Sequence, residues 1–251
     1  MKLVLFTLLF STSLWSKPLV LISHYDPFGG AKSNNSETIA KELERHFSRP
    51  DSPIRVKLCA LETKFDVAFN KTEACLGDER PDMILGLGET GCNLKIETLG
   101  RNLDHTRGAD NAGVERKNSE IITDAPEAIG FTYPLAEMYC AVEKKARKKI
   151  FVSNNAGSFV CNNTAFQLAY RYQEIPSGFI HVPLNSCRNL ERINQEVIGQ
   201  LKKMLHRVGE IDLSESYRLP TDSYRVREFR EYWEDRDECK HEFFKRTRGV
   251  N

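Results

Sequence analysis

The sequence lacks an excess of charge of either sign. Its 251 residues include 36 Lys and Arg against 35 Asp and Glu, which gives a formal net charge of +1. Proteins that bind nucleic acid or an anionic membrane surface typically carry a strongly basic face or domain. The near balance therefore argues against a nucleic-acid partner. A content of 40% hydrophobic and 28% charged residues is typical of a globular chain rather than a disordered one.

Long hydrophobic runs are also scarce. The first apolar run, residues 3–10, is too short to span a bilayer, and no later run is longer and more apolar, so we predict no integral membrane span. Lys2 precedes this run, and small polar residues follow it as far as Ser16, which is the pattern of a secretory signal. We expect residues 1–16 to be a signal peptide and the protein to be exported, to the periplasm or the medium. The alternative, a buried first strand, is disfavoured because a better candidate strand, Leu19–Ser23, follows at once.

The cysteines lack the spacing of a zinc site, since there is no Cys-x-x-Cys pair and no cluster of Cys and His. Their number is odd. In an oxidising compartment six of them can form three disulfides, and one remains free as a candidate nucleophile or as an inert thiol. The seven are Cys59, Cys75, Cys92, Cys140, Cys161, Cys187 and Cys239.

Internal repeats and low-complexity linkers are absent, and segments typical of strands alternate with segments of helical periodicity. This order predicts a three-layer α/β/α domain over residues 17–208, with a mostly parallel twisted sheet covered by helices on both faces. Active sites of such sheets lie beyond the carboxyl ends of the strands. Strands are expected at residues 19–23, 54–61, 83–87, 94–103, 121–123, 149–152 and 179–183. Helices are expected at residues 36–47, 65–75, 135–148, 162–172 and 190–208.

Residues 209–251 differ from the rest because aromatic residues are interleaved with charges of both signs. We expect a C-terminal helical extension, with an amphipathic helix at about 223–245 that docks its aromatic side on the domain. Cys239 is available to attach it by a disulfide. The alternative, a helix that binds a partner or a membrane surface, is weakened by the mixed charge.

Three segments carry candidate chemistry. Cys161 follows a predicted strand and Gly157 and lies near the start of a predicted helix, where the helix dipole favours a thiolate and free N–H groups can hold an oxyanion. His181 lies in an apolar strand one strand-helix step later, so adjacent parallel strands would bring it near Cys161, where it can accept the thiol proton. Glu97 can orient that imidazole. Taken singly, each has a plainer interpretation: a buried cysteine, a core histidine and a surface carboxylate.

Four segments together resemble pyroglutamyl peptidase I, a cysteine peptidase family also called pyrrolidone-carboxylate peptidase. They occur in the family's order at compatible spacing, within residues 19–208, and exclude the signal and the extension. The segments are Asp-Pro-Phe-Gly-Gly at 26–30, Arg-x-x-Asp-Asn-x-Gly at 107–113, Asn-Ala-Gly-Ser-Phe-Val-Cys-Asn at 155–162 and Phe-Ile-His-Val-Pro at 179–183.

The resemblance implies an α/β enzyme that removes N-terminal pyroglutamate from peptides without a metal or organic cofactor. Cys161 matches the family's nucleophile, His181 its base and Glu97 its acidic residue. Tyr25 and Phe28 match the two aromatic positions of the pyroglutamate pocket. The resemblance also places Glu89 and Arg107 in the substrate site, where Arg107 would help backbone amides to hold the oxyanion.

Some positions depart from the family's pattern. Tyr25 replaces a phenylalanine, Glu89 stands where the family often has glutamine, and Gly108 replaces a bulkier residue. Two other functions therefore stay open, a thiol amidase with a different acyl or lactam substrate and a non-catalytic secreted binding protein. The sequence also leaves open whether the chain forms a homo-oligomer.

Overall fold

The computed structural model describes residues 16–247, so the predicted signal at 1–16 lies outside the described residues except for Ser16. A six-stranded sheet has the order β2-β1-β3-β8-β4-β7. The first four strands of this order are mutually parallel, and β4 and β7 are parallel to each other but antiparallel to β8. The strands are β1 (Leu19–Tyr25), β2 (Arg55–Leu61), β3 (Met83–Glu89), β4 (Lys95–Glu97), β7 (Phe151–Ser153) and β8 (Ser177–Val182).

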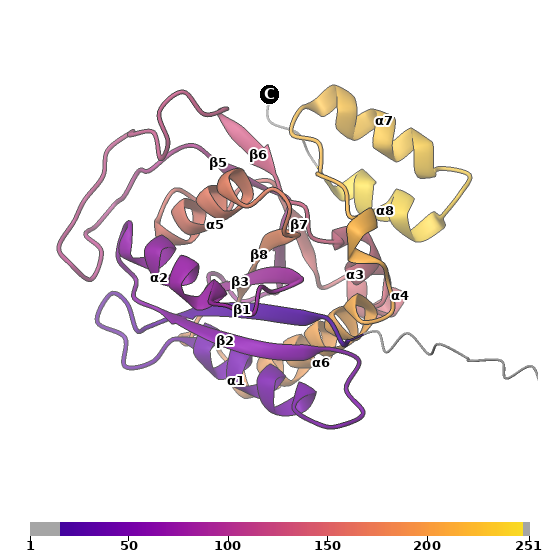
Figure 1. Cartoon of the computed structure of the whole chain (residues 1–251), viewed down its shortest axis with the longest axis horizontal. Coiled ribbons are helices and arrows are strands. Elements are labelled where there is room, and N and C mark those ends of the chain that lie inside the picture. The colour runs from indigo at the N-terminus through magenta and orange to yellow at the C-terminus, as the bar shows by residue number, and fades with distance from the viewer. Residues whose placement is uncertain (1–15, 248–251) are drawn as a thin grey trace, which may run out of the picture.

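Helices cover both faces of this sheet, as predicted (Figure 1). Helices α1 (Asn35–Phe47) and α6 (Leu190–Val208) pack on one face, and α2 (Val67–Leu76) and α5 (Val160–Arg171) on the other. Every residue of β1 and β8 is buried, as expected for strands covered on both sides. The three-layer α/β/α prediction is confirmed.

The predicted strand at 94–103 is two strands, because β5 (Leu99–Arg101) leaves the main sheet after β4 and pairs with β6 (Ala128–Gly130). The strand predicted at 121–123 is wrong. The N–H groups of Ile121 and Ile122 both donate to the side-chain oxygen of Asn102, at 2.9 Å each, instead of to a neighbouring strand.

The single helix predicted at 135–148 is also wrong, because the structure has two short helices, α3 (Leu135–Cys140) and α4 (Lys144–Arg147). The guanidinium of Arg147 donates to the carbonyls of Cys140 and Val142, at 3.4 and 3.1 Å. A continuous helix would use these carbonyls for its own N–H groups four residues later. A side chain therefore replaces the helical hydrogen bonds at the break.

Three disulfides use six of the seven cysteines, and Cys161 is free. The free thiol is thus the one that the sequence marks as a candidate nucleophile. The bridges join β2 to α2 (Cys59–Cys75), the segment after β3 to the segment after β8 (Cys92–Cys187), and α3 to the extension (Cys140–Cys239).

The C-terminal extension folds as η1 (Leu213–Glu215), α7 (Ser223–Trp233) and α8 (Glu238–Arg246). Its docking through aromatic residues is confirmed, since Phe243 and Phe244 are buried. The single helix predicted at 223–245 is wrong, because Asp237 accepts the N–H groups of Cys239 and Lys240 and so starts a new helix.

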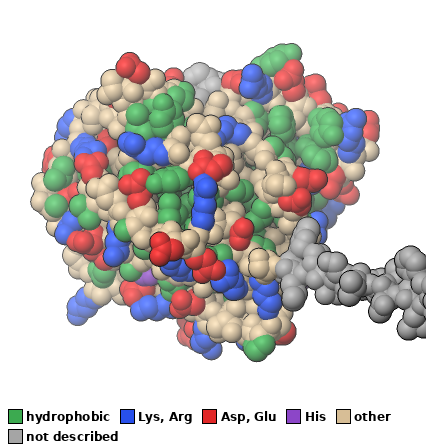
Figure 2. Space-filling model, viewed as in Figure 1, with side chains coloured by type: hydrophobic (Ala, Val, Ile, Leu, Met, Phe, Trp, Pro, Cys, Tyr) green, Lys and Arg blue, Asp and Glu red, His purple; other side chains and the backbone are tan. Residues whose placement is uncertain are grey.

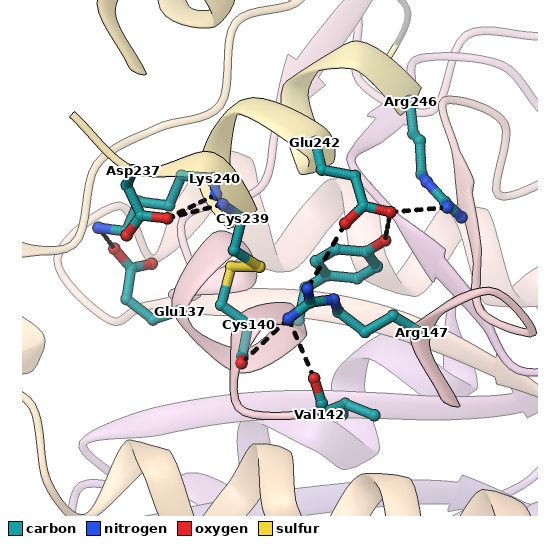
Figure 3. Close-up of a disulfide and its surroundings, with 10 residues drawn as sticks. Glu137, Cys140, Val142, Arg147, Asp237, Cys239, Lys240, Glu242 and Arg246 are labelled. Carbon is teal, nitrogen blue, oxygen red and sulfur yellow. Dashed lines mark hydrogen bonds and ion pairs between the residues drawn. A yellow bond between two sulfur atoms is a disulfide. The ribbon is translucent and has the colours of Figure 1, made fainter. Parts of the chain in front are cut away.

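Figure 3 shows how the extension is attached to α3 and the chain beyond it. Beside the Cys140–Cys239 bridge, Lys240 pairs with Glu137 at 2.6 Å. Glu242 forms ion pairs with two guanidinium groups, that of Arg246 at 2.9 Å and that of Arg147 at 3.5 Å.

Acidic and basic side chains are interspersed over the face shown in Figure 2, in keeping with the balanced composition. None of the helices within residues 16–247 has the length and apolar character needed to cross a membrane.

Candidate active site

A cavity of about 370 Å³ opens beyond the carboxyl ends of β1, β3 and β8. It brings together five of the residues predicted from the sequence: Cys161, His181, Tyr25, Phe28 and Glu89. Further lining comes from other segments, including Asn34, Thr63, Lys95, the stretch 155–157, Phe159 and Leu184.

His181 is held by a carboxylate behind it. The Nδ1 atom of this buried histidine lies 2.8 Å from Oε1 of Glu97, which has no exposed surface. The Tyr133 hydroxyl lies 2.9 Å from the backbone oxygens of both Glu97 and Phe179, either of which can accept its single proton, and so it links β4 to β8 beside the pair. The carboxylate can thus fix the imidazole orientation and stabilise its cation, with Nε2 left for chemistry.

Cys161 is the second residue of α5, which confirms its predicted place near a helix start. Its sulfur packs against Gly88, where an added Cβ would lie 2.8 Å from Sγ. Gly88 pairs in register with His181 on the adjacent parallel strand. Side chains in register on neighbouring strands share a face of the sheet, so the thiol and the imidazole occupy the same face one strand apart. Glycine at position 88 leaves the space that the sulfur fills.

The route by which the chain brings Cys161 to His181 differs from the one predicted. Strands β7 and β8 are not adjacent, because β4 lies between them and runs antiparallel to β8. Their carboxyl ends therefore do not meet. The segment after Ser153 instead carries the chain back to α5, which packs against β3 and β8.

The thiol of Cys161 is protonated at neutral pH. Burial raises its pKa to about 12, and the carboxylates of Glu97 and Glu89 act in the same direction. The backbone N–H of Cys161 lowers the pKa, but it does not offset the burial. This direction is opposite to the one expected from the helix start, and attack by this sulfur then requires a base that removes the proton.

Aromatic rings form one side of the cavity. Phe28 is 38% exposed, and its ring centroid lies 4.8 Å from that of Phe159, which in turn lies 5.4 Å from the ring of Phe65. Tyr25 is buried at the end of β1. Sequence reasoning missed Phe159, although it stands two residues before Cys161. This side of the cavity suits a flat, uncharged group.

Glu89 has a structural partner as well as a place in the cavity. Its Oε2 accepts the N–H of Asn35, the first residue of α1, at 2.7 Å. A carboxylate at this position complements the positive end of the helix. Burial raises the pKa of Glu89, and two backbone N–H groups oppose that shift.

The structure does not bring Arg107 to the site. Arg107 and Gly108 are exposed in the loop between Asp104 and Arg116, and neither lines the cavity. The loop is organised by Asp110, which accepts the N–H groups of Phe65, Ala112 and Val114. Among residues 16–247 no group of three or more His, Cys, Asp or Glu could hold a metal ion.

Comparison with known proteins shows which family the chain resembles. The model of the family described as "Pyroglutamyl peptidase" matches residues 18–201. The pyrrolidone-carboxylate peptidase of Lacticaseibacillus paracasei is 32% identical over 172 residues, which cover 65% of this chain and 77% of that protein. The corresponding peptidase of Thermosipho africanus is 30% identical over 204 residues, which cover 74% and 96%.

Solved structures give the same result. A mutant pyrrolidone carboxyl peptidase from Pyrococcus furiosus matches with a TM-score of 0.64 at 25% identity, covering 77% of this chain and 100% of that one. The family match ends before the extension, at residue 201. The chain belongs to the pyroglutamyl peptidase family and is a cysteine-type omega peptidase.

Proposed function

We propose that this protein hydrolyses the amide bond that follows an N-terminal pyroglutamyl residue, through a Cys161–His181–Glu97 triad. The observation that carries the proposal is the 2.8 Å contact between Glu97 and His181 in the cavity that also contains Cys161. Cys161 is also the free thiol in a chain whose other six cysteines are paired.

The reaction begins with proton transfer, because the thiol is neutral at rest. His181 takes the proton as the sulfur attacks the carbonyl carbon of the pyroglutamyl group. The tetrahedral intermediate collapses to a thioester, and His181 gives the proton to the departing amine. Water, activated by the same imidazole, then releases pyroglutamate and restores the thiol. Glu97 stabilises the imidazolium at both stages.

The developing oxyanion needs hydrogen-bond donors close to the sulfur. The first N–H groups of a helix have no acceptor within the helix. Cys161 stands in the first turn of α5, so these donors lie close to its sulfur and can reach the carbonyl oxygen that it attacks. They supply the stabilisation that the sequence had assigned in part to Arg107.

The aromatic side of the cavity determines which acyl group the enzyme binds. A pyroglutamyl ring is an uncharged lactam, and Tyr25, Phe28 and Phe159 offer it apolar surface. An ordinary N-terminal ammonium group would lose its hydration there. Glu89 is the observation that favours the second candidate, a thiol amidase for a different acyl group, because it places a carboxylate in the same cavity.

Turnover of a fluorogenic pyroglutamyl amide by residues 17–251 tests the reaction. We expect wild-type activity and its loss in Cys161→Ala, with an unchanged circular dichroism spectrum. Cys161→Ala that still turns over would exclude the triad. A folded wild type that is inactive on this substrate but active on another acyl amide would favour the second candidate.

Export is part of the proposal. Three disulfides suit an oxidising compartment, and residues 1–16 have the pattern of a signal peptide. Expression of the full chain in a bacterium, followed by cell fractionation and N-terminal sequencing, tests it. A mature protein outside the cytoplasm that begins near residue 17 is the expected result, and an uncleaved cytoplasmic protein would contradict it.

A further inference from the structure

The cavity contains a charged group that the mechanism above does not use. Lys95 is the first residue of β4, is partly buried, and lines the cavity together with Cys161 and His181. Within residues 16–247 its ammonium group has no hydrogen-bond or ion-pair partner. A lysine that lines a reaction cavity and is not paired with a protein carboxylate is available to an anionic group of the substrate.

Strand pairing fixes where Lys95 lies. It is the direct antiparallel partner of His181, and such partners share a face of the sheet with Cβ atoms about 5 Å apart. Glu97, two residues further along β4, lies on that same face and holds Nδ1 of His181. Both groups thus lie on the β4 side of the imidazole, the carboxylate fully buried and the lysine lining the cavity.

The direction of the reaction assigns Lys95 to one part of the substrate. His181 delivers a proton to the departing amine, so the residue that follows pyroglutamate begins beside the imidazole. The acyl ring occupies the aromatic side formed by Tyr25, Phe28 and Phe159. Lys95 therefore lies beside the leaving residue.

The β3 side of the cavity is less favourable for a negatively charged group of the substrate. Glu89 ends β3, on the other side of β8 from β4, and carries a carboxylate. An anionic leaving residue is repelled on that side and attracted on the β4 side. The two charged side chains together orient a substrate that carries a carboxylate next to the scissile bond.

We propose that Lys95 binds a carboxylate of the residue that follows pyroglutamate, so that the enzyme prefers substrates with a negative charge there. The inference rests on the proposed function and adds the substrate class. The carboxylate has two possible sources, the free C-terminus of a pyroglutamyl dipeptide and the side chain of an acidic residue, and both offer the same group to the ammonium.

Three substrates separate the sources: pyroglutamyl-alanine amide, pyroglutamyl-alanine as the free acid, and pyroglutamyl-glutamate with its α-carboxyl group amidated. Release of the new amino group gives kcat/KM for each. We expect wild type to prefer at least one carboxylate substrate over the neutral amide by about 3- to 10-fold, the range of a partly exposed charge pair. Added salt should reduce the preference.

The ratio of kcat/KM between charged and neutral substrates is read within each variant, so a change in overall activity cancels. Lys95→Met should bring the ratio to about 1, Lys95→Glu should bring it below 1, and Lys95→Arg should keep it above 1. Lys203→Met removes the same charge from α6, outside the cavity, and should keep the wild-type ratio.

The outcomes separate this inference from the proposed function. A wild type that cleaves the neutral amide, with no preference for either carboxylate substrate, overturns the role of Lys95 alone. A preference that persists in Lys95→Met overturns it as well. A wild type that cleaves no pyroglutamyl substrate overturns the proposed function.

Discussion

The α/β domain and the C-terminal extension are held together in different ways. Every residue of β1 is buried, whereas α7 buries only Val226 among its 11 residues. The extension instead depends on the buried pair Phe243 and Phe244, the Cys140–Cys239 bridge and ion pairs such as Lys240–Glu137. The domain is stabilised by a continuous core. The extension adds Leu219, Phe243 and Phe244 to that core and is otherwise held by separate attachments to α3, α4 and the β6 region.

This difference indicates where function and stability reside. The cavity is built from the sheet, α5 and the segments around them, and none of the residues 185–247 lines it. Changes in the domain should therefore alter catalysis or global stability, and changes in the extension should alter its attachment while catalysis persists.

The largest effect should come from the buried carboxylate of the domain. Glu97→Gln keeps the shape of the side chain but removes the charge that stabilises the imidazolium, and should lower kcat/KM on a pyroglutamyl amide by about 10²- to 10⁴-fold. Glu44→Gln, at an exposed position of α1, should leave it unchanged. A Glu97→Gln enzyme with more than half of the wild-type activity would remove Glu97 from the mechanism.

The next effect concerns the core behind the site. A Cβ at Gly178 would lie 1.8 Å from a ring carbon of Tyr133, the residue that ties β4 to β8. Gly178→Ala should lower the free energy of unfolding by about 3 kcal/mol, measured by urea denaturation. Gly199→Ala in α6 meets no atom within 4 Å and should raise it slightly, by about 0.5–1 kcal/mol. Equal effects of the two changes would contradict the packing described here.

A smaller effect is expected for the attachment of the extension. Replacing Cys140 and Cys239 by Ser removes a bridge that spans 99 residues, and should destabilise the protein by about 2–4 kcal/mol. Limited proteolysis should then cut the chain between α7 and α8 sooner than in wild type. Because no residue of 209–247 lines the cavity, kcat/KM should stay within a factor of two of wild type.

The matching change at Cys59 and Cys75 removes a bridge that spans 16 residues, inside the domain. The chain-entropy argument assigns it the smaller loss of stability. It should leave the extension as resistant to protease as in wild type. If it exposes the extension equally, the two regions do not unfold separately.

The smallest effect of a substitution is expected for the rate at which the Cys161 thiol is alkylated. Since the pKa of Cys161 is raised to about 12, alkylation by iodoacetamide should accelerate about tenfold per pH unit from pH 7 to 10. Glu89 contributes to that raised pKa, so Glu89→Gln should speed alkylation about two- to threefold at fixed pH. A rate that is flat above pH 7 would show a preformed thiolate.

The raised pKa of Cys161 also makes the free energy of unfolding depend on pH. The folded state holds the thiol proton more tightly than the unfolded chain, in which a cysteine has a pKa of about 8.5. This contribution to stability is complete below that value and is lost as the pH rises toward 12. Cys161→Ala should reduce the loss of stability between pH 9 and 11, as measured by urea denaturation.

Local patterns and motifs predicted the layered fold, and they predicted that Cys161 and His181 lie close together. Cys161, His181 and Glu97 lie in short segments whose residues are close in sequence, and the odd cysteine count was consistent with one free thiol. The reversed direction of β4 was not predictable, because a three-residue strand carries no signal of its orientation. The position of Lys95 in the cavity was not predicted for the same reason, since it depends on the pairing of Lys95 with His181.

The errors have a common physical origin. Arg147 and Asn102 replace backbone partners with side-chain hydrogen bonds, and these bonds join residues whose proximity is set by the tertiary fold. Arg107 was assigned to the site by motif spacing, but the loop that carries it turns its side chain to solvent. Sequence patterns report local preference, and each of these features is decided by contacts between distant segments.

The raised pKa of the Cys161 thiol also bears on the export that we propose. Oxidants attack thiolates far more readily than thiols. In surroundings oxidising enough to form three disulfides, a reactive resting thiolate would soon be lost as sulfenic acid or a mixed disulfide. Because its pKa is raised, Cys161 keeps its proton at rest, and in the mechanism that we propose His181 removes this proton when a substrate is in place. In an oxidising compartment this arrangement would exchange resting reactivity of the thiol for resistance to oxidation.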